Sequence, residues 1–250
     1  MKAENNKTKR RLAFHWGIAA AATIVLAVVV GWAGSWSTGP SYGGRYGEAW
    51  LRDVFAPNGA GTSQTSAIAA FNQMGTNGIA FLVESLDRRE TAWIRFYRVA
   101  YGKLPQSLRR RVRQPIPADT LANAASLVLL NVRDDSPEKS VPRLVRLLGA
   151  PNPRTRLYAA GVIQHYALNY SKFSFAPFRP ELVRALADTN DWIRIDIALA
   201  LENAKLGGPE LLPAVKPALT NSDPVIRNAA QVITRQLEAA NKAAPPNHGP

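Results

Sequence analysis

Few side chains of this sequence have types and positions suited to catalysis. Nucleophilic catalysis needs a nucleophile with a base within hydrogen-bond reach. The chain has no cysteine, and of its three histidines only His165, in "GVIQHYAL", lies in a segment expected to fold. No G-x-S-x-G motif is present to expose a serine on a sharp turn. His165 is therefore interpreted as an ordinary helical residue, and no catalytic residue is assigned.

Two pairs of carboxylates could act as a general acid and base. They are Asp134 with Asp135, and Asp188 with Asp191. Both pairs lie in expected turns, where an acidic side chain commonly caps the next helix. No P-loop, dinucleotide-binding fingerprint or zinc-ligand spacing occurs. The sequence therefore predicts a protein that is not an enzyme, with no metal site and no cofactor.

Positive charge is densest between Glu84 and Arg113, where nine basic residues face three acidic ones. The candidates for binding an anionic partner are Arg88, Arg89, Arg95, Arg98, Arg109, Arg110, Arg111 and Arg113. The aromatic residues among them are Trp93, Phe96, Tyr97 and Tyr101. Such a mixture is typical of surfaces that bind phosphate groups. The alternative is a solvated helix face whose aromatic side chains are buried.

The N-terminus carries a second concentration of charge, followed by a long apolar segment. Residues 1–11 form a basic arm with five basic residues and one acidic residue, and residues 12–34 carry no formal charge. About 20 apolar residues suffice to cross a bilayer, and a preceding basic arm remains in the cytoplasm. The sequence therefore predicts a single-pass anchor at 12–34 in the cytoplasmic membrane, with a periplasmic or extracellular domain. A cleaved signal peptide is the alternative.

The remaining chain divides by composition. Residues 35–62 are rich in Gly, Ser and Pro and predict a stalk, with a short helix in 48–55 that packs on the first repeat. Residues 63–240 predict a repeat domain, because helix-length segments with apolar residues three or four apart alternate with brief breaks. No strand is expected. Residues 241–250 predict a disordered tail.

The breaks contain residues that end and begin helices. Gly75 and the pair Gly207 and Gly208 suit the left-handed conformation that ends a helix. The expected caps of the following helices are Thr76, Asp119, Asn190 and Asp223. Each break is therefore expected to be a short turn between antiparallel helices.

Three of these breaks share a pattern of a polar turn followed by arginine. Their residues are Asn152 and Arg156, Asn190 and Arg194, and Asp223 and Arg227. The arginines are 38 and 33 residues apart, a period that indicates stacked supersecondary units. We expect these six residues to form a hydrogen-bonded ladder between neighbouring repeats.

The turn pattern Asp/Asn-Pro-x-Val/Ile-Arg resembles that of the HEAT repeat, in its membrane-anchored bacterial type, over residues 63–240. The resemblance implies an all-α fold: an α-solenoid of about four to five HEAT-like helical hairpins, preceded by a single N-terminal transmembrane helix. The sequence departs from the pattern at Thr155, where a branched apolar residue is usual, and at Asp191, where proline is usual. It departs again at 104–118, where a first helix is expected.

The resemblance and the charge pattern lead to three functional hypotheses. The first is a non-enzymatic, membrane-anchored scaffold for a protein partner on the outer side of the cytoplasmic membrane. The second is electrostatic binding of anionic lipid or envelope polymer through residues 88–113. The third is a HEAT-like lyase or DNA-glycosylase type of enzyme. Nucleic acid is not the expected partner, because the second helices carry mixed charge, whereas phosphate tracking needs a continuous basic face.

Overall fold

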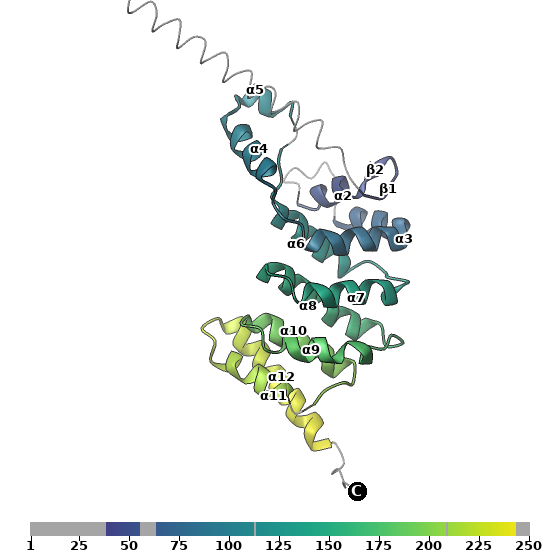
Figure 1. Cartoon of the computed structure of the whole chain (residues 1–250), viewed down its shortest axis with the longest axis vertical. Helices are drawn as coiled ribbons and strands as arrows, with labels where there is room; N and C mark the ends of the chain where they lie inside the picture. The colour runs from purple at the N-terminus through teal and green to yellow at the C-terminus, as the bar shows by residue number, and fades with distance from the viewer. Residues whose placement is uncertain (1–38, 56–63, 113, 209, 244–250) are drawn as a thin grey trace, which may run out of the picture. The chain divides into compact units, whose positions relative to one another are not determined.

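The computed structural model describes residues 39–55, 64–112, 114–208 and 210–243 (Figure 1). These residues form two units, one of residues 89–118 and one of residues 39–88 with 119–243. The predicted arm, the predicted span at 12–34, Arg113 and most of the predicted tail lie outside the described residues. Among the helices that are described, none is long and apolar enough to cross a membrane.

The larger unit begins with a short β-hairpin and a helix. Strands β1 (Ser41–Tyr42) and β2 (Arg45–Tyr46) pair antiparallel around Gly43 and Gly44, whose φ angles are 57° and 73°. Left-handed glycines at both central positions produce the turn twist that hairpins favour. Helix α2 (Gly47–Asp53) follows and packs on the next helix, burying Trp50 and Leu51. The short helix expected in 48–55 is therefore present, but the composition of 35–62 did not predict a hairpin packed beside it.

Helix α3 (Gln64–Leu86) is interrupted at Gly75, where φ is 56° and ψ is −139°. The sequence predicted two helices broken at this glycine, and the break is confirmed. The part before Gly75 buries Phe71, and the part after it buries Ile79 and Leu82, whose spacing of three places them on one side of that part. This side supplies the first layer of the core.

The rest of the larger unit consists of helices joined by short turns (Figure 1). They are α6 (Ala118–Leu129), α7 (Pro137–Leu147), α8 (Pro153–Asn169), α9 (Arg179–Ala185), α10 (Asp191–Asn203), α11 (Leu211–Val215) and α12 (Pro224–Ala243). Short 3-10 stretches, η1 (Ala176–Phe178) and η2 (Lys216–Thr220), lie before α9 and after α11. The predicted all-α repeat fold is confirmed: α7 with α8, α9 with α10, and α11 with α12 form successive hairpins.

The two helices of each hairpin pack unequally with those of the next hairpin. Helices α8 and α10 form the most extensive helix–helix contact of the described chain, whereas α7 and α9 barely meet. The α8–α10 contact is dry, because Ala160, Ile163, Ala198 and Leu201 are fully buried. Small side chains there let the two helices approach closely. The stack is therefore closed along α8, α10 and α12 and opens between α7 and α9.

The smaller unit contains α4 (Ala92–Lys103) and the single-turn α5 (Gln106–Arg109). Thr91 caps α4 by accepting a hydrogen bond from the Ile94 amide at 3.2 Å. Arg109 holds α5 against the end of α4, since its Nε donates to the Leu104 carbonyl at 2.7 Å. The expected irregularity at 104–118 thus contains one helical turn in place of the usual first helix of a repeat.

The residue that ends helix α10 is not one of those that the sequence predicted. The amides of Lys205 and Leu206 donate to the carbonyls of Glu202 and Leu201, at 2.9 and 2.8 Å, and Lys205 has a φ of 56°. This is the Schellman arrangement, in which one residue takes the left-handed conformation. The prediction that Gly207 and Gly208 would take it is wrong. Gly207 instead provides space, because a Cβ there would lie 2.9 Å from a carboxylate oxygen of Glu202.

Replacing Lys205 with glycine is expected to raise the free energy of unfolding by about 1 kcal/mol, because a side chain in the left-handed region carries a steric cost that glycine avoids. Thermal unfolding should shift upward by about 2 to 4 °C. Lys205→Ala is the matched control, since it removes the exposed amine but keeps the strained Cβ. Equal melting temperatures for the two variants would contradict the prediction.

Candidate functional site

Arg156 joins the turn before α8 to the turn before α10. Its Nε donates to Asp188 Oδ2 at 2.6 Å, and its Nη1 donates to the Ala150 carbonyl at 3.0 Å. Both side chains are largely buried, at 19% and 9% exposure. Burial alone would raise the pKa of Asp188, but hydrogen bonds from Arg156 and the Asn190 amide outweigh it and hold the pKa below its usual value. Asp188 is therefore a charged link between two hairpins.

Arg194 makes the corresponding link one hairpin further along. It donates to the Asp188 carbonyl at 2.7 Å and to the Ala214 carbonyl in α11 at 3.0 Å. It also forms an ion pair with Asp191, which accepts a hydrogen bond from the Asn221 amide group in the next turn. Arg227 bonds only within its own turn in the described chain, donating to the carbonyls of Asn221 and Ser222 at 2.6 and 2.8 Å.

The three polar residues expected to join this ladder cap helices instead. Asn152, Asn190 and Asp223 each accept a hydrogen bond from the amide two residues later, at 3.0, 2.9 and 2.8 Å. The carboxylates of this ladder that contact a neighbouring hairpin are instead those of Asp188 and Asp191. In the sequence these two residues form the carboxylate pair described above, which was interpreted only as helix capping.

Both single-residue departures from the expected turn pattern have a structural reason. Thr155 is buried, and its hydroxyl donates to the Leu86 carbonyl at the end of α3, at 3.2 Å. An apolar residue would leave that carbonyl without this partner. Asp191 pairs with Arg194 and Asn221 as described, which proline could not do. The unusual residues therefore connect neighbouring layers.

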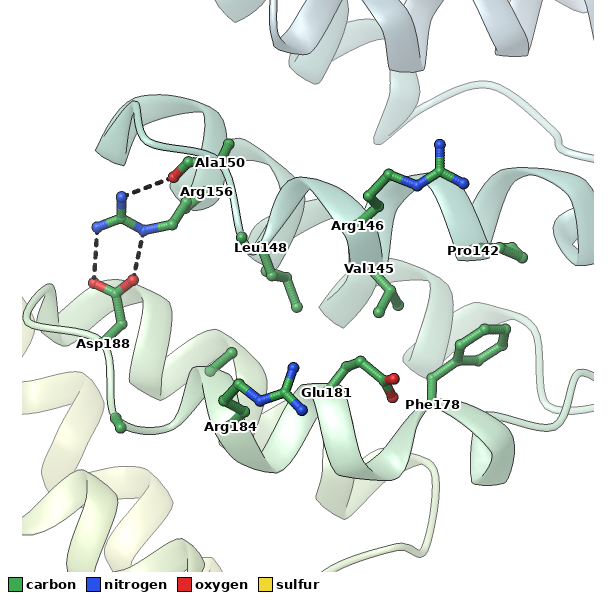
Figure 2. A pocket seen from close by; sticks show the side chains of 13 residues that line it. Pro142, Val145, Arg146, Leu148, Ala150, Arg156, Phe178, Glu181, Arg184 and Asp188 are labelled. Atoms are coloured by element: carbon green, nitrogen blue, oxygen red, sulfur yellow. Dashed lines mark hydrogen bonds and ion pairs between the residues drawn. The ribbon is translucent and has the colours of Figure 1, made fainter.

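A cavity of about 620 Å³ lies between α7 and α9, where the stack opens. Figure 2 shows Arg156 and Asp188 at one end and Pro142 and Phe178 at the other. Charges of both signs line it, with Arg146 and Arg184 opposed by Glu181. Because the Arg156 end is already internally paired, this cavity offers no concentrated charge to a ligand.

Asp134 forms a buried polar cluster with two tyrosines. The Tyr166 hydroxyl donates to Asp134 Oδ2 at 2.8 Å, and the Asp134 backbone amide donates to the Tyr170 hydroxyl oxygen at 2.7 Å. The tyrosine rings stack with centroids 4.7 Å apart. Burial, and next the charge of Asp134, raise the pKa of Tyr166. Because the Tyr166 hydroxyl keeps its proton, its role is structural and it does not act as a base.

Replacing Tyr166 with phenylalanine is expected to lower the free energy of unfolding by about 1 to 2 kcal/mol, because a buried carboxylate oxygen loses its hydrogen-bond donor. Urea unfolding measures the change. Tyr158→Phe is the matched control on the same helix, since the Tyr158 side chain is only half-buried and, within the described residues, no equivalent bond to a carboxylate holds it. Equal losses in the two variants would show that the Asp134 bond contributes nothing specific.

Asp196 on α10 is the carboxylate that sequence reasoning missed. It lies against α8 at Gly161, where an added Cβ would be 3.6 Å from Asp196 Oδ2. No hydrogen bond or ion pair joins it to any side chain in the described part of the chain. Loss of solvation raises its pKa to about 7. A carboxylate without a partner is costly to bury, so this position is a candidate for binding a group from outside the chain.

Asp196 lies on a surface that we call the α8–α10 face. Its residues have helical spacing and none is fully buried: Tyr158, Gly161, His165 and Leu168 of α8, and Trp192, Asp196, Leu199 and Asn203 of α10. Leu168 is 59% exposed. Burial lowers the pKa of His165, whose Nδ1 lies 3.1 Å from the Asn169 amide nitrogen, so this imidazole is neutral near pH 7. The face is therefore mainly apolar, with Asp196 as its charged group.

The basic segment divides between the two units. Arg88 belongs to the larger unit and pairs with Glu48 at 2.7 Å; because Arg52 shares this carboxylate, the charge of Arg88 is only partly compensated. In the smaller unit Arg98 pairs with Glu90 at 2.8 Å, and Arg109 binds backbone carbonyls. The candidates with no partner in the described structure are Arg89, Arg95, Arg110 and Arg111, all in the smaller unit.

The aromatic residues of α4 are only partly buried. Trp93, Phe96 and Val99 are 39%, 48% and 59% exposed, and they follow one another at intervals of three residues. The Trp93 and Phe96 rings lie 5.7 Å apart. Tyr97 is buried at 8% exposure. The alternative, a solvated helix face whose aromatic side chains are buried, is therefore wrong for Trp93 and Phe96.

No group of three or more His, Asp or Glu side chains in the described residues is placed to hold a metal ion. Asp134 and Asp135 diverge, since Asp134 is buried whereas Asp135 is exposed and pairs with Arg133 at 2.8 Å. Neither carboxylate pair from the sequence thus forms a general acid and base facing a common cavity.

Part of the hairpin array resembles a known protein family. Residues 141–234, from α7 into α12, match the family profile of HEAT repeats. The match supports a HEAT-repeat family. No curated protein matches the chain at a significant level. The HEAT-like segment contains Asp188, Asp191 and Asp196, so both the links between hairpins and the unpaired carboxylate belong to it. HEAT repeats are generally not catalytic and commonly mediate protein–protein contacts.

Proposed function

We propose that the chain is a non-enzymatic scaffold that binds a protein partner on the α8–α10 face. The HEAT-like match of residues 141–234 supports a role in protein interaction. Asp196 is the observation that carries the choice of face, because it is the charged group of a mainly apolar surface and has no partner among the described residues. A cation supplied by the partner would compensate the lost solvation of Asp196.

The chemistry of the face defines the segment that fits it. Leu168, Trp192 and Leu199 would contact apolar side chains, and Asp196 would accept a hydrogen bond from one lysine or arginine. Burying such a charge pair contributes more to specificity than to affinity, because both groups lose water. The proposed ligand is therefore an amphipathic segment with one basic residue among apolar ones.

We infer the location of the scaffold from the sequence alone. The uncharged residues 12–34 behind a basic arm support a single-pass anchor in the cytoplasmic membrane, with the repeats on its outer side. The scaffold would then present the α8–α10 face to proteins of the periplasm or cell exterior.

Site-specific photo-crosslinking in membranes of the native host tests this proposal. A crosslinking residue at Leu199 should capture a reproducible protein, and Asp196→Lys should reduce that product at least tenfold, because two cations would face each other. Leu212 of α11 is the matched control, since it is also a half-buried leucine but lies off the face. Equal products from both positions, or a product unaffected by Asp196→Lys, would overturn the proposal.

A further inference from the structure

The surface of the smaller unit combines exposed aromatic side chains with unpaired positive charge. Residues 89–112 contain seven basic residues and one acidic residue, Glu90. Glu90 is engaged by Arg98. Four arginines remain without a partner in the described structure: Arg89, Arg95, Arg110 and Arg111. An acidic surface would therefore complement the positive charge of this unit.

The apolar part of this surface is too large to be explained by scattered single residues. Trp93, Phe96 and Val99 form one stripe along α4, and Leu108 on α5 is 47% exposed. Arg109 fixes α5 against α4 through the Leu104 carbonyl, so Leu108 and the neighbouring arginines are held by the same short unit. Adjacent exposed apolar side chains beside basic ones mark an interaction site.

We propose that α4 and α5 lie on the surface of an anionic lipid bilayer, with Trp93, Phe96 and Val99 inserted between headgroups. An amphipathic helix binds membranes in this way when its apolar face enters the headgroup boundary and its basic residues contact anionic lipid. Tryptophan in particular favours that boundary. The arginines keep their charge at headgroup level while their stems cover apolar surface.

A lipid surface fits these residues better than a soluble polyanion does. Anionic polymers such as nucleic acid are bound mainly through phosphate neutralisation, which requires a long basic track, whereas four unpaired arginines cover a short one. A polymer would also leave Val99 and Leu108 in water. This inference concerns residues distant in sequence from the α8–α10 face and does not depend on the scaffold proposal.

The absence of cysteine from the chain permits a direct depth measurement. The full chain, carrying the single substitution Val99→Cys and an environment-sensitive fluorophore, is reconstituted into vesicles of phosphatidylcholine with or without 30% phosphatidylglycerol. We expect blue-shifted emission, and quenching by bromine on the lipid chains, only in the anionic vesicles. Val232→Cys is the matched control, because Val232 of α12 is similarly exposed, at 54%, but lies in the larger unit.

Charge reversal separates attraction by the arginines from insertion of the apolar stripe. Arg89, Arg95, Arg110 and Arg111 are replaced with glutamate in the labelled chain, and the inserted fraction should fall about tenfold or more. The matched control reverses four exposed basic residues of the larger unit, Lys139, Lys172, Lys216 and Arg235, and so gives the same net charge. This control should retain insertion.

Three results would overturn the inference. One is a label at position 99 that stays in water in anionic vesicles. Another is equal loss of insertion in the two charge-reversal variants, which would show dependence on net charge alone. The third is an equal emission shift when heparin is added to the detergent-solubilised chain without vesicles, which would identify a soluble polyanion as the ligand.

Discussion

Asp196→Asn is expected to raise the free energy of unfolding by about 2 to 4 kcal/mol at pH 8 and to change it little at pH 4. The pKa of Asp196 in the folded protein is about 7, against an ordinary value of 3.8. Between these values the unfolded chain releases the proton while the folded chain keeps it. The wild-type protein therefore loses stability as pH rises from about 4 to 7, and the asparagine variant lacks this loss.

Urea unfolding at pH 4, 6 and 8 measures this difference. Asp135→Asn is the control, because the Asp135 carboxylate is 76% exposed, and its substitution should change stability by no more than about 0.5 kcal/mol. A wild-type protein and an Asp196→Asn variant with parallel pH profiles would show that Asp196 is fully hydrated in the folded state. The same result would remove the main support for the α8–α10 face as a binding site.

Asp188→Ala is expected to lower the free energy of unfolding by about 3 kcal/mol near pH 7, because it leaves the largely buried guanidinium of Arg156 without its acid. It also removes the acceptor for the Asn190 amide, 2.9 Å from Asp188 Oδ1. Asp188→Asn should cost less, since it keeps an acceptor oxygen but loses the charge. Thermal and urea unfolding measure both changes.

The pH dependence of this variant has the opposite sign to that of Asp196. The pKa of Asp188 is lowered in the folded protein, so its contribution is present above about pH 4 and is lost as pH falls through the folded value. Asp188→Ala should therefore approach the wild type in strong acid. A variant that differs from the wild type equally at pH 7 and pH 2 would contradict an ionic contribution from Asp188.

The sequence predicted the helices well because apolar periodicity and turn residues are local signals. The breaks at Gly75, Asn152 and Asn190 needed no knowledge of neighbouring chain. The left-handed residue at the end of α10 was assigned to the wrong position, since Lys205 has no local preference for that conformation. The conformation there is defined by the bond from the Lys205 amide to the Glu202 carbonyl and by the bond from the Leu206 amide to the Leu201 carbonyl.

The candidate site was harder to predict because it depends on contacts between layers. Asp196 has the sequence position of a solvated residue on an amphipathic helix, and its partial burial, with α8 close by at Gly161, is a property of the folded chain alone. Asp188 and Asp191 were recognised as a pair, but their partners in the neighbouring hairpins, Arg156 and Asn221, are 32 and 30 residues away in sequence. For the basic segment, composition gave the residue types, whereas the pairing of Arg88, Arg98 and Arg109 required the structure.

The unequal packing of the hairpins has a mechanical consequence. The seam between α8 and α10 consists of fully buried, interlocked side chains, and shear along it would disrupt close packing. Helices α7 and α9 are separated by the open cavity, so widening or narrowing that space breaks few apolar contacts. We therefore expect the array of hairpins to bend about the α8–α10 seam. The Arg156–Asp188 ion pair should resist widening of the space between α7 and α9.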